Sequence, residues 1–136
     1  GNKWDTIFTR NVLKFGRHYY KFKILQEKGN TGLADFYIGI FPLNKHTSLP
    51  LTDKLIRQEL HCYYILPTLG YFRCAEKGTV REYCERQEAI DTVIEMFVDL
   101  EEWQIKYSVN DKDCGIASEI EEGEYRVAAS LYVEQS

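Results

Sequence analysis

The chain has 136 residues, a formal net charge of −4 and a hydrophobic content of 44%. The length fits one globular domain over residues 1–136, and the absence of an apolar run of about 18 residues or a signal-peptide pattern predicts a cytoplasmic protein without a membrane partner. The mildly acidic balance argues against nucleic acid as a partner. The aromatic content of 14% is high and suits strands better than helices.

The N-terminal part of the chain predicts four strands. Short strands are expected at Trp4–Phe8 and Val12–Phe15. In His18–Leu25, apolar residues occupy every second position, which is the period of a half-buried strand. Ala34–Phe41 is more continuously apolar, so we expect a strand that is buried on both faces.

The middle of the chain changes character. Thr52 is a suitable N-cap and the apolar residues after it recur at helical spacing, so a short helix is predicted at Asp53–Leu60, within an insertion near residues 52–60. Two aromatic-rich strands follow, at Cys62–Leu66 and Leu69–Ala75. The predicted fold therefore contains one short helix among its strands.

The C-terminal part shows the clearest alternation. Glu76–Glu88 is charged and predicts a surface loop with a short strand at Val80–Tyr83. Three longer strands are predicted at Thr92–Asp99, Trp103–Asn110 and Glu124–Val133. Asn110–Asp113 predicts a turn, because Asn and Asp tolerate left-handed backbone conformations. About ten short strands at regular spacing predict an antiparallel β-sandwich.

Several segments, in order along the chain, resemble the SPRY domain. They are Gly16–Ile24, Ile38–Ile40, Tyr83 with Asp91–Asn110, and Gly115–Ala117 with Tyr125–Tyr132. The first is similar to the family's G-x-H-Y-W strand, with Tyr20 in place of tryptophan, and the last resembles its closing Y-x-P-A-V-S-L-Y. Together they span most of residues 16–132. The resemblance implies an all-β fold, a bent antiparallel sandwich of the concanavalin-like kind, with the short helix as an insertion.

The sequence departs from the family pattern at three positions. Trp103 stands where the family usually has a turn glycine, Glu95 where it has the glycine after V-I, and Cys84 where it has the glycine after tyrosine. The first fifteen residues do not match a PRY segment. The resemblance is therefore to a bare and divergent SPRY domain.

The four cysteines are scattered, with no C-x-x-C pair. A metal site built from His61, Cys62, Cys74 and Cys84 is one interpretation, but ligands usually come in closely spaced pairs, so we expect reduced thiols and no metal or cofactor. A disulfide between Cys74 and Cys84 fits a hairpin geometrically, but it is not expected in a reducing compartment.

No local motif for catalysis is present, and we expect a protein that is not an enzyme. His18 lies within an alternating segment and fits a packed or surface histidine better than a general base. Asp99 and Glu101 could be interpreted as a catalytic acid pair. They fit better as acceptors of hydrogen bonds from backbone N–H groups near a hairpin. The resemblance gives Asp99 a structural role.

Surface recognition is the remaining kind of chemistry, and loops are where a rigid sandwich usually places it. The candidate partner-binding residues are Tyr63, Tyr64, Tyr71, Arg73 and Trp103. Tyr and Arg are enriched at interfaces. Trp103 has two interpretations: it packs against the core in phase with Ile105 and Tyr107, or it lies exposed in a turn as a binding anchor.

The resemblance and the residues together predict a non-catalytic protein–protein interaction module. It would bind a peptide segment or a folded protein partner through the surface loops of the sandwich, as part of a longer polypeptide. Two alternatives are lectin-like glycan binding and a structural subunit of a large assembly.

Overall fold

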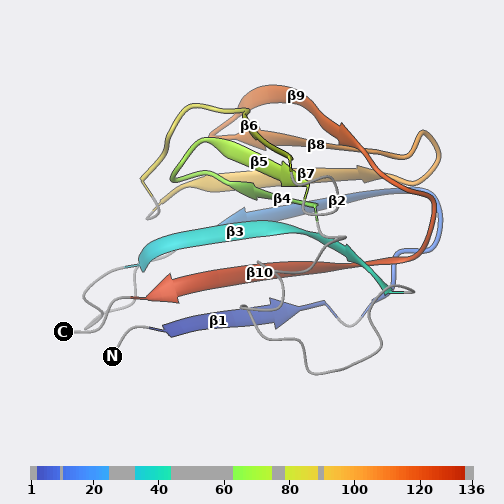
Figure 1. Ribbon diagram of the computed structural model, residues 1–136, viewed down its shortest axis with the longest axis horizontal. Coiled ribbons are helices and arrows are strands. Elements are labelled where there is room, and N and C mark those ends of the chain that lie inside the picture. Colours follow the sequence, from blue (N-terminus) through green and yellow to red (C-terminus); the bar gives the residue numbers. More distant parts are fainter. Residues whose placement is uncertain are drawn as a thin grey trace.

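The computed structural model describes residues 3–9, 11–24, 33–43, 63–74, 79–88 and 91–133. Within these residues the chain forms ten strands in two antiparallel sheets that lie face to face (Figure 1). The strands are β1 (Lys3–Phe8), β2 (Arg17–Lys23), β3 (Leu33–Pro42), β4 (Tyr63–Leu66), β5 (Tyr71–Cys74), β6 (Thr79–Glu82), β7 (Val93–Asp99), β8 (Gln104–Val109), β9 (Lys112–Glu119) and β10 (Tyr125–Val133). The expected all-β antiparallel sandwich is confirmed.

The two sheets differ in size. The larger sheet has the strand order β1-β10-β3-β4-β5-β6, and the smaller has the order β2-β7-β8-β9. Strand β10 lies between β1 and β3, so segments from opposite ends of the sequence are neighbours (Figure 1). One hydrogen bond links the edge strands β6 and β9 of the two sheets: the side chain of Arg81 donates through Nη2 to the backbone carbonyl of Ile116 at 3.0 Å.

The core lies between the sheets and follows from the alternation in the sequence. In β7 and β8 every second side chain is buried, and the intervening ones are only partly buried. The buried residues of these two strands are Ile94, Met96, Val98, Ile105, Tyr107 and Val109. Because successive side chains on a strand point to opposite faces, the remaining residues form the outer face of the smaller sheet.

Strand β3 is buried on both faces, as its continuous apolar sequence predicted. Residues 36–42 are all buried. At Gly39 the neighbouring strand β4 comes so close that an added Cβ would lie 1.9 Å from the carbonyl oxygen of Tyr63 and 2.5 Å from Cβ of Tyr64. Only glycine fits this contact, so the Ile38-Gly39-Ile40 sequence is explained by packing.

Three of the predicted elements differ from the structure or lie outside the described residues. The strand predicted at Val12–Phe15 is wrong: only Leu13 forms an isolated bridge, to Tyr125, and its side chain fills the core. The turn predicted over residues 110–113 is shorter, since Asn110 and Asp111 alone have positive φ (50° and 66°) and β9 begins at the next residue. The helix predicted over residues 53–60 lies outside the described residues.

Strand β9 was not predicted as a separate strand. Its pairing with β8 contains two register irregularities, so its burial does not alternate, and Ala117 is its one fully buried side chain. Without a period of two, the sequence carried no strand signal there. In the part of the chain that the structure describes, no helix is long and apolar enough to cross a membrane.

Candidate functional site

Two of the predicted binding residues, Tyr63 and Tyr64, are neighbours on β4 and point to opposite faces of the larger sheet. Tyr63 belongs to the core, where its hydroxyl accepts a hydrogen bond from the backbone N–H of Glu121 at 3.2 Å and its ring contacts Tyr125. Tyr64 lies on the other face and contacts the ring of Tyr37. Both are only 2% exposed, so neither offers surface for direct contact with a partner.

The structure brings Tyr64, Tyr71 and Arg73 together on the outer face of the larger sheet. Arg73 pairs with Tyr64 across β5 and β4, and its Nη1 donates a hydrogen bond to the Tyr64 hydroxyl at 3.0 Å. Its Nε is buried and has no hydrogen-bond partner among the described residues. Tyr71 is half-buried and lies two positions away on β5. Three of the four grouped residues therefore lie together and are largely covered, whereas Tyr63 lies on the opposite face.

Trp103 is not part of that cluster, since it lies in the turn between β7 and β8 on the smaller sheet. Its backbone is left-handed, with φ of 55°, at the position where the SPRY pattern has a glycine. The ring is half-buried and packs against the core, and the carbonyl accepts a hydrogen bond from the N–H of Ile120 at 2.9 Å. Trp103 is thus both a turn residue and a packing residue.

The same turn is held by Asp99. Its Oδ1 accepts hydrogen bonds from the backbone N–H groups of Glu101 and Glu102, at 2.9 and 3.0 Å, and its Oδ2 accepts one from Arg17 Nε at 3.1 Å. The Glu102 N–H contributes most to holding the pKa of Asp99 below its usual value, with further contributions from the Glu101 N–H and Arg17. The expected structural role of Asp99 is confirmed.

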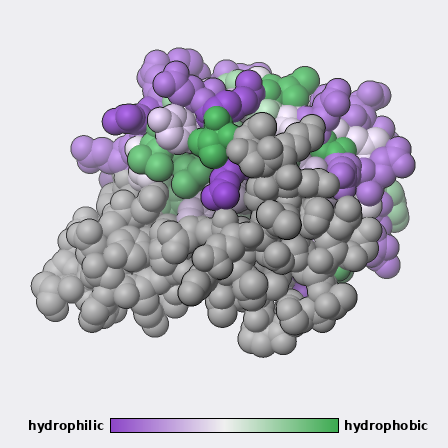
Figure 2. Space-filling model, viewed as in Figure 1, coloured by the Kyte–Doolittle hydropathy of each residue, from purple (hydrophilic) through white to green (hydrophobic). Residues whose placement is uncertain are grey.

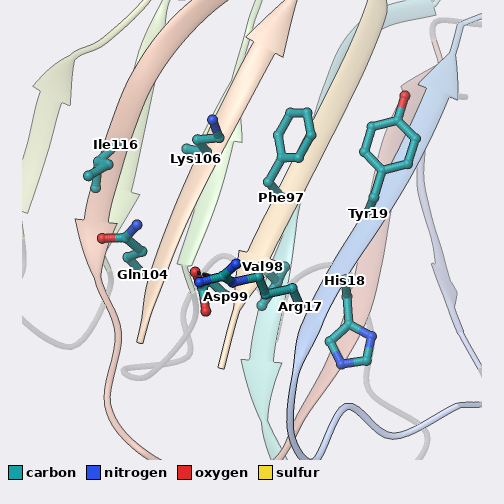
Figure 3. Close-up of a pocket in the computed structure, with 9 residues that line it drawn as sticks. All are labelled: Arg17, His18, Tyr19, Phe97, Val98, Asp99, Gln104, Lys106 and Ile116. Atoms are coloured by element: carbon teal, nitrogen blue, oxygen red, sulfur yellow. Dashed lines mark hydrogen bonds and ion pairs between the residues drawn. The ribbon is translucent and has the colours of Figure 1, made fainter. Parts of the chain in front are cut away.

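A groove that the sequence did not predict lies on the outer face of the smaller sheet (Figure 3). It encloses about 420 Å³. The residues that line it are Arg17, His18, Tyr19, Phe97, Val98, Asp99, Gln104, Lys106 and Ile116. Strand register places Tyr19, Phe97, Lys106 and Ile116 in one row that crosses all four strands of the sheet. We call these four residues the aromatic–lysine row.

The aromatic–lysine row is exposed at both ends. Tyr19 is 51% exposed and Ile116 is 52% exposed. The rings of Tyr19 and Phe97 lie 5.0 Å apart between centroids, and Lys106 Nζ lies 5.0 Å from the Phe97 centroid. Figure 3 shows these three side chains extending toward the same side of the groove. The row is a continuous apolar and cationic surface.

The groove has fixed walls. The Tyr19 hydroxyl donates a hydrogen bond to the carboxylate of Glu95, which is the main reason that the pKa of Tyr19 is raised. The backbone of Ile116 is held by Arg81 from the neighbouring sheet. At the other end, His18 Nε2 lies 2.8 Å from the carbonyl oxygen of Phe15, as expected for a surface histidine bonded to a neighbour. A ligand would therefore meet a surface that is already ordered.

The sequence held a partial signal for this groove. Tyr19 occupies the polar phase of its strand, with the lysines of β2, and Phe97 occupies the outward phase of β7. Aromatic rings at outward-facing strand positions are the sequence signal that indicates such a groove. The register that aligns them across four strands is not visible in the sequence.

A second hollow, of about 410 Å³, lies near the start of β9. It is lined by Cys84 and Cys114 with residues 82, 83, 85, 112 and 113. Burial raises the pKa of the Cys84 thiol to about 11, so this thiol is protonated at neutral pH. Lys112 Nζ forms an ion pair with Glu85 at 3.0 Å. Within this hollow, Lys112 and Glu85 therefore satisfy each other.

The cysteines considered for a metal site are separated by the fold. Cys74 is buried in the core and Cys84 is half-buried at the second hollow, both as free thiols. His61 and Cys62 lie outside the described residues. Within the described ranges, no three His, Cys, Asp or Glu side chains gather in a way that could hold a metal ion.

Comparison with known proteins gives structural likeness without sequence likeness. No protein-family model matches the chain, and no curated protein matches its sequence. Among solved structures, the chain is similar to the SPRY domain of human HERC1, with a TM-score of 0.70 and 16% identity over 96% of this chain and 76% of that chain. It is also similar to the TRIM65 PSpry domain, with a TM-score of 0.60 and 8% identity over 96% of this chain and 69% of that chain. Both likenesses cover nearly the whole chain, and they show that it has the fold of a SPRY domain.

Proposed function

We propose that the chain is a non-catalytic protein-interaction module that binds a segment of a partner protein in the groove on the smaller sheet. The observation that carries the proposal is the aromatic–lysine row, because it brings the half-exposed side chains of Tyr19 and Ile116 and the partly buried ring of Phe97 together in one groove. The fold supports it, since SPRY domains are mainly used to bind protein partners.

The energetics favour a small number of contacts. A partner side chain over Tyr19 and Phe97 would remove water from both rings, and aromatic contacts of this kind contribute about 2 kcal/mol each where they dominate an interface. The groove lies on paired strands, so little ordering cost accompanies binding. The proposal therefore puts recognition on a sheet face and not on loops. The role predicted for loops, and for Tyr71, Arg73 and Trp103, stays a separate prediction.

Site-specific photo-crosslinking tests the proposal. A benzophenone amino acid at Ile116, in the groove, is compared with one at Val80, which is 54% exposed on the larger sheet. We expect the Ile116 probe to crosslink to a defined partner protein, and we expect the additional substitution Phe97→Ala to remove that product. Crosslinking to the same partner from Val80 but not from Ile116 would place the interface on the other sheet and refute the groove.

Competition separates this function from the alternatives. Loss of the crosslinked product when peptides, but not sugars, are added before irradiation is expected for protein recognition, whereas loss with sugars alone would indicate a lectin. A structural subunit would present one broad apolar face. On the face seen in Figure 2, the described residues show small groups of hydrophobic side chains bordered by hydrophilic ones.

A further inference from the structure

The charges in the groove are unequally satisfied. Three of its nine lining residues carry a formal charge at neutral pH: Arg17, Asp99 and Lys106. Arg17 Nε lies 3.1 Å from a carboxylate oxygen of Asp99 and 3.1 Å from one of Glu101. The second oxygen of Asp99 accepts two backbone N–H bonds. At this end of the groove, each charged group therefore has a partner.

Lys106 is different. Its ammonium lies over the face of Phe97, and among the described residues no carboxylate lies within ion-pair distance of it. The rows on either side contain Glu95 and Asp99, and Glu95 already accepts the hydroxyl hydrogen of Tyr19 while Asp99 is held by Arg17 and two backbone N–H groups. A ring face attracts a cation but satisfies none of its N–H donors. A ligand that covers Lys106 would desolvate an ammonium group, which is unfavourable unless the ligand supplies an anion.

The spacing of the row sets the spacing of the ligand groups. Neighbouring strands are about 4.8 Å apart, so the midpoint of the Tyr19–Phe97 pair lies roughly 7 Å from Lys106 along the row. In an extended peptide, the side chains of residues i and i+2 point to the same side and are also roughly 7 Å apart. An extended segment that crosses the strands matches both positions at once.

We infer that the groove takes an extended peptide segment in which a large apolar side chain and an acidic side chain are two residues apart. The apolar side chain covers Tyr19 and Phe97, and the carboxylate meets the Lys106 ammonium. This inference rests on the proposed function and specifies its ligand. The partner is therefore a protein with an exposed apolar-x-acidic segment, and charge complementarity at Lys106 selects it.

The test uses four fluorescein-labelled synthetic peptides with Gly-Ser flanks and the central sequences Trp-Gly-Glu, Trp-Gly-Gln, Trp-Gly-Lys and Ala-Gly-Glu. Affinities are measured by fluorescence anisotropy, and the binding site is mapped by amide chemical shifts of the 136-residue chain. We expect the Trp-Gly-Glu peptide to bind about fivefold more tightly than the Trp-Gly-Lys and Ala-Gly-Glu peptides, with the largest shifts along the aromatic–lysine row.

Charge reversal at one position gives the sharper result. Lys106→Glu is expected to reverse the order of the Trp-Gly-Glu and Trp-Gly-Lys peptides, and Lys106→Gln is expected to abolish the difference between them. Lys23→Glu is the matched control, because Lys23 is also exposed on this sheet but lies four residues from Tyr19 on β2, outside the groove. The control should keep the wild-type order. Amide spectra of each variant establish that the fold is retained.

Three other outcomes would each refute a different part of the proposal. If the peptides bind in the groove with equal affinity whatever their charge, the acidic specificity is wrong and the proposed function stands. If no peptide binds at millimolar concentration while the Ile116 crosslink to a partner persists, the apolar-x-acidic ligand is wrong. If shifts appear only around Tyr71 and Arg73, both the ligand and the groove are refuted.

Discussion

The hydroxyl of Tyr107, on β8, donates a hydrogen bond to the carbonyl oxygen of Ile38, on β3, at 3.0 Å, and so joins the two sheets through the core. Tyr107 is fully buried, and its backbone N–H donates to the hydroxyl of Tyr83 at 3.0 Å. The Tyr83 hydroxyl in turn donates to the carbonyl of Gly115. Burial raises the pKa of both phenols well above the usual value, so both remain neutral donors.

Tyr107→Phe should destabilise the fold without changing its architecture. The substitution removes the hydroxyl and leaves the buried Ile38 carbonyl without this partner, which costs about 1–3 kcal/mol. The measurement is the free energy of unfolding from urea denaturation followed by fluorescence. Tyr20→Phe is the control, because the Tyr20 ring packs against the core but no hydrogen bond of its hydroxyl is present among the described residues. Equal stability of the two variants would show that water replaces the lost bond.

Trp103 provides a test of the turn between β7 and β8. Trp103→Ala and Trp103→Gly both remove the ring from the core, but only alanine keeps the steric cost of a left-handed backbone at φ of 55°. That cost is about 1 kcal/mol, so the glycine variant should be the more stable of the two by about this amount. Thermal and urea unfolding of the pair measure the difference. A more stable alanine variant would mean that the turn leaves the left-handed conformation once the ring is removed.

The turn also predicts a pH dependence. The pKa of Asp99 is lowered in the folded state, so its stabilising contribution is present above the unfolded value of about 3.9 and is lost as the pH falls through the lower folded pKa. Asp99→Asn should therefore be less stable than the wild type at neutral pH, and the gap should narrow in acid. Urea unfolding between neutral pH and strong acid measures the gap. Glu102→Gln, which removes an exposed carboxylate of the same turn, should not show this narrowing.

Alternation made the central strands of the smaller sheet readable from sequence. The predicted strands Thr92–Asp99 and Trp103–Asn110 differ from β7 and β8 by single residues at their ends, because every second side chain in them enters the core. The strand predicted at Val12–Phe15 is absent from the structure. Leu13 lies outside the strands, but its side chain is buried in the core. Burial of a single side chain leaves no period to detect.

The groove shows why a site is harder to predict than a strand. Its row takes one residue from each of four strands, and only the register brings Tyr19, Phe97, Lys106 and Ile116 into line. A shift of one residue in any strand would turn that side chain toward the core. Residue type alone does not distinguish Tyr63, which lies in the core, from an exposed ring such as Tyr19.

Gly39 gives the strongest predicted effect of a single methyl group. Gly39→Ala would place a Cβ 1.9 Å from the carbonyl oxygen of Tyr63, so β3 and β4 must separate, at a cost of about 3 kcal/mol. Gly115→Ala is the matched control: Gly115 has φ of +80° but no atom near its added Cβ, so it carries only the left-handed cost of about 1–2 kcal/mol. Urea unfolding compares the two variants. If the Gly39 variant were the more stable one, β4 would be able to move away from β3 freely, and Tyr64 and Arg73 would then be exposed by the same movement.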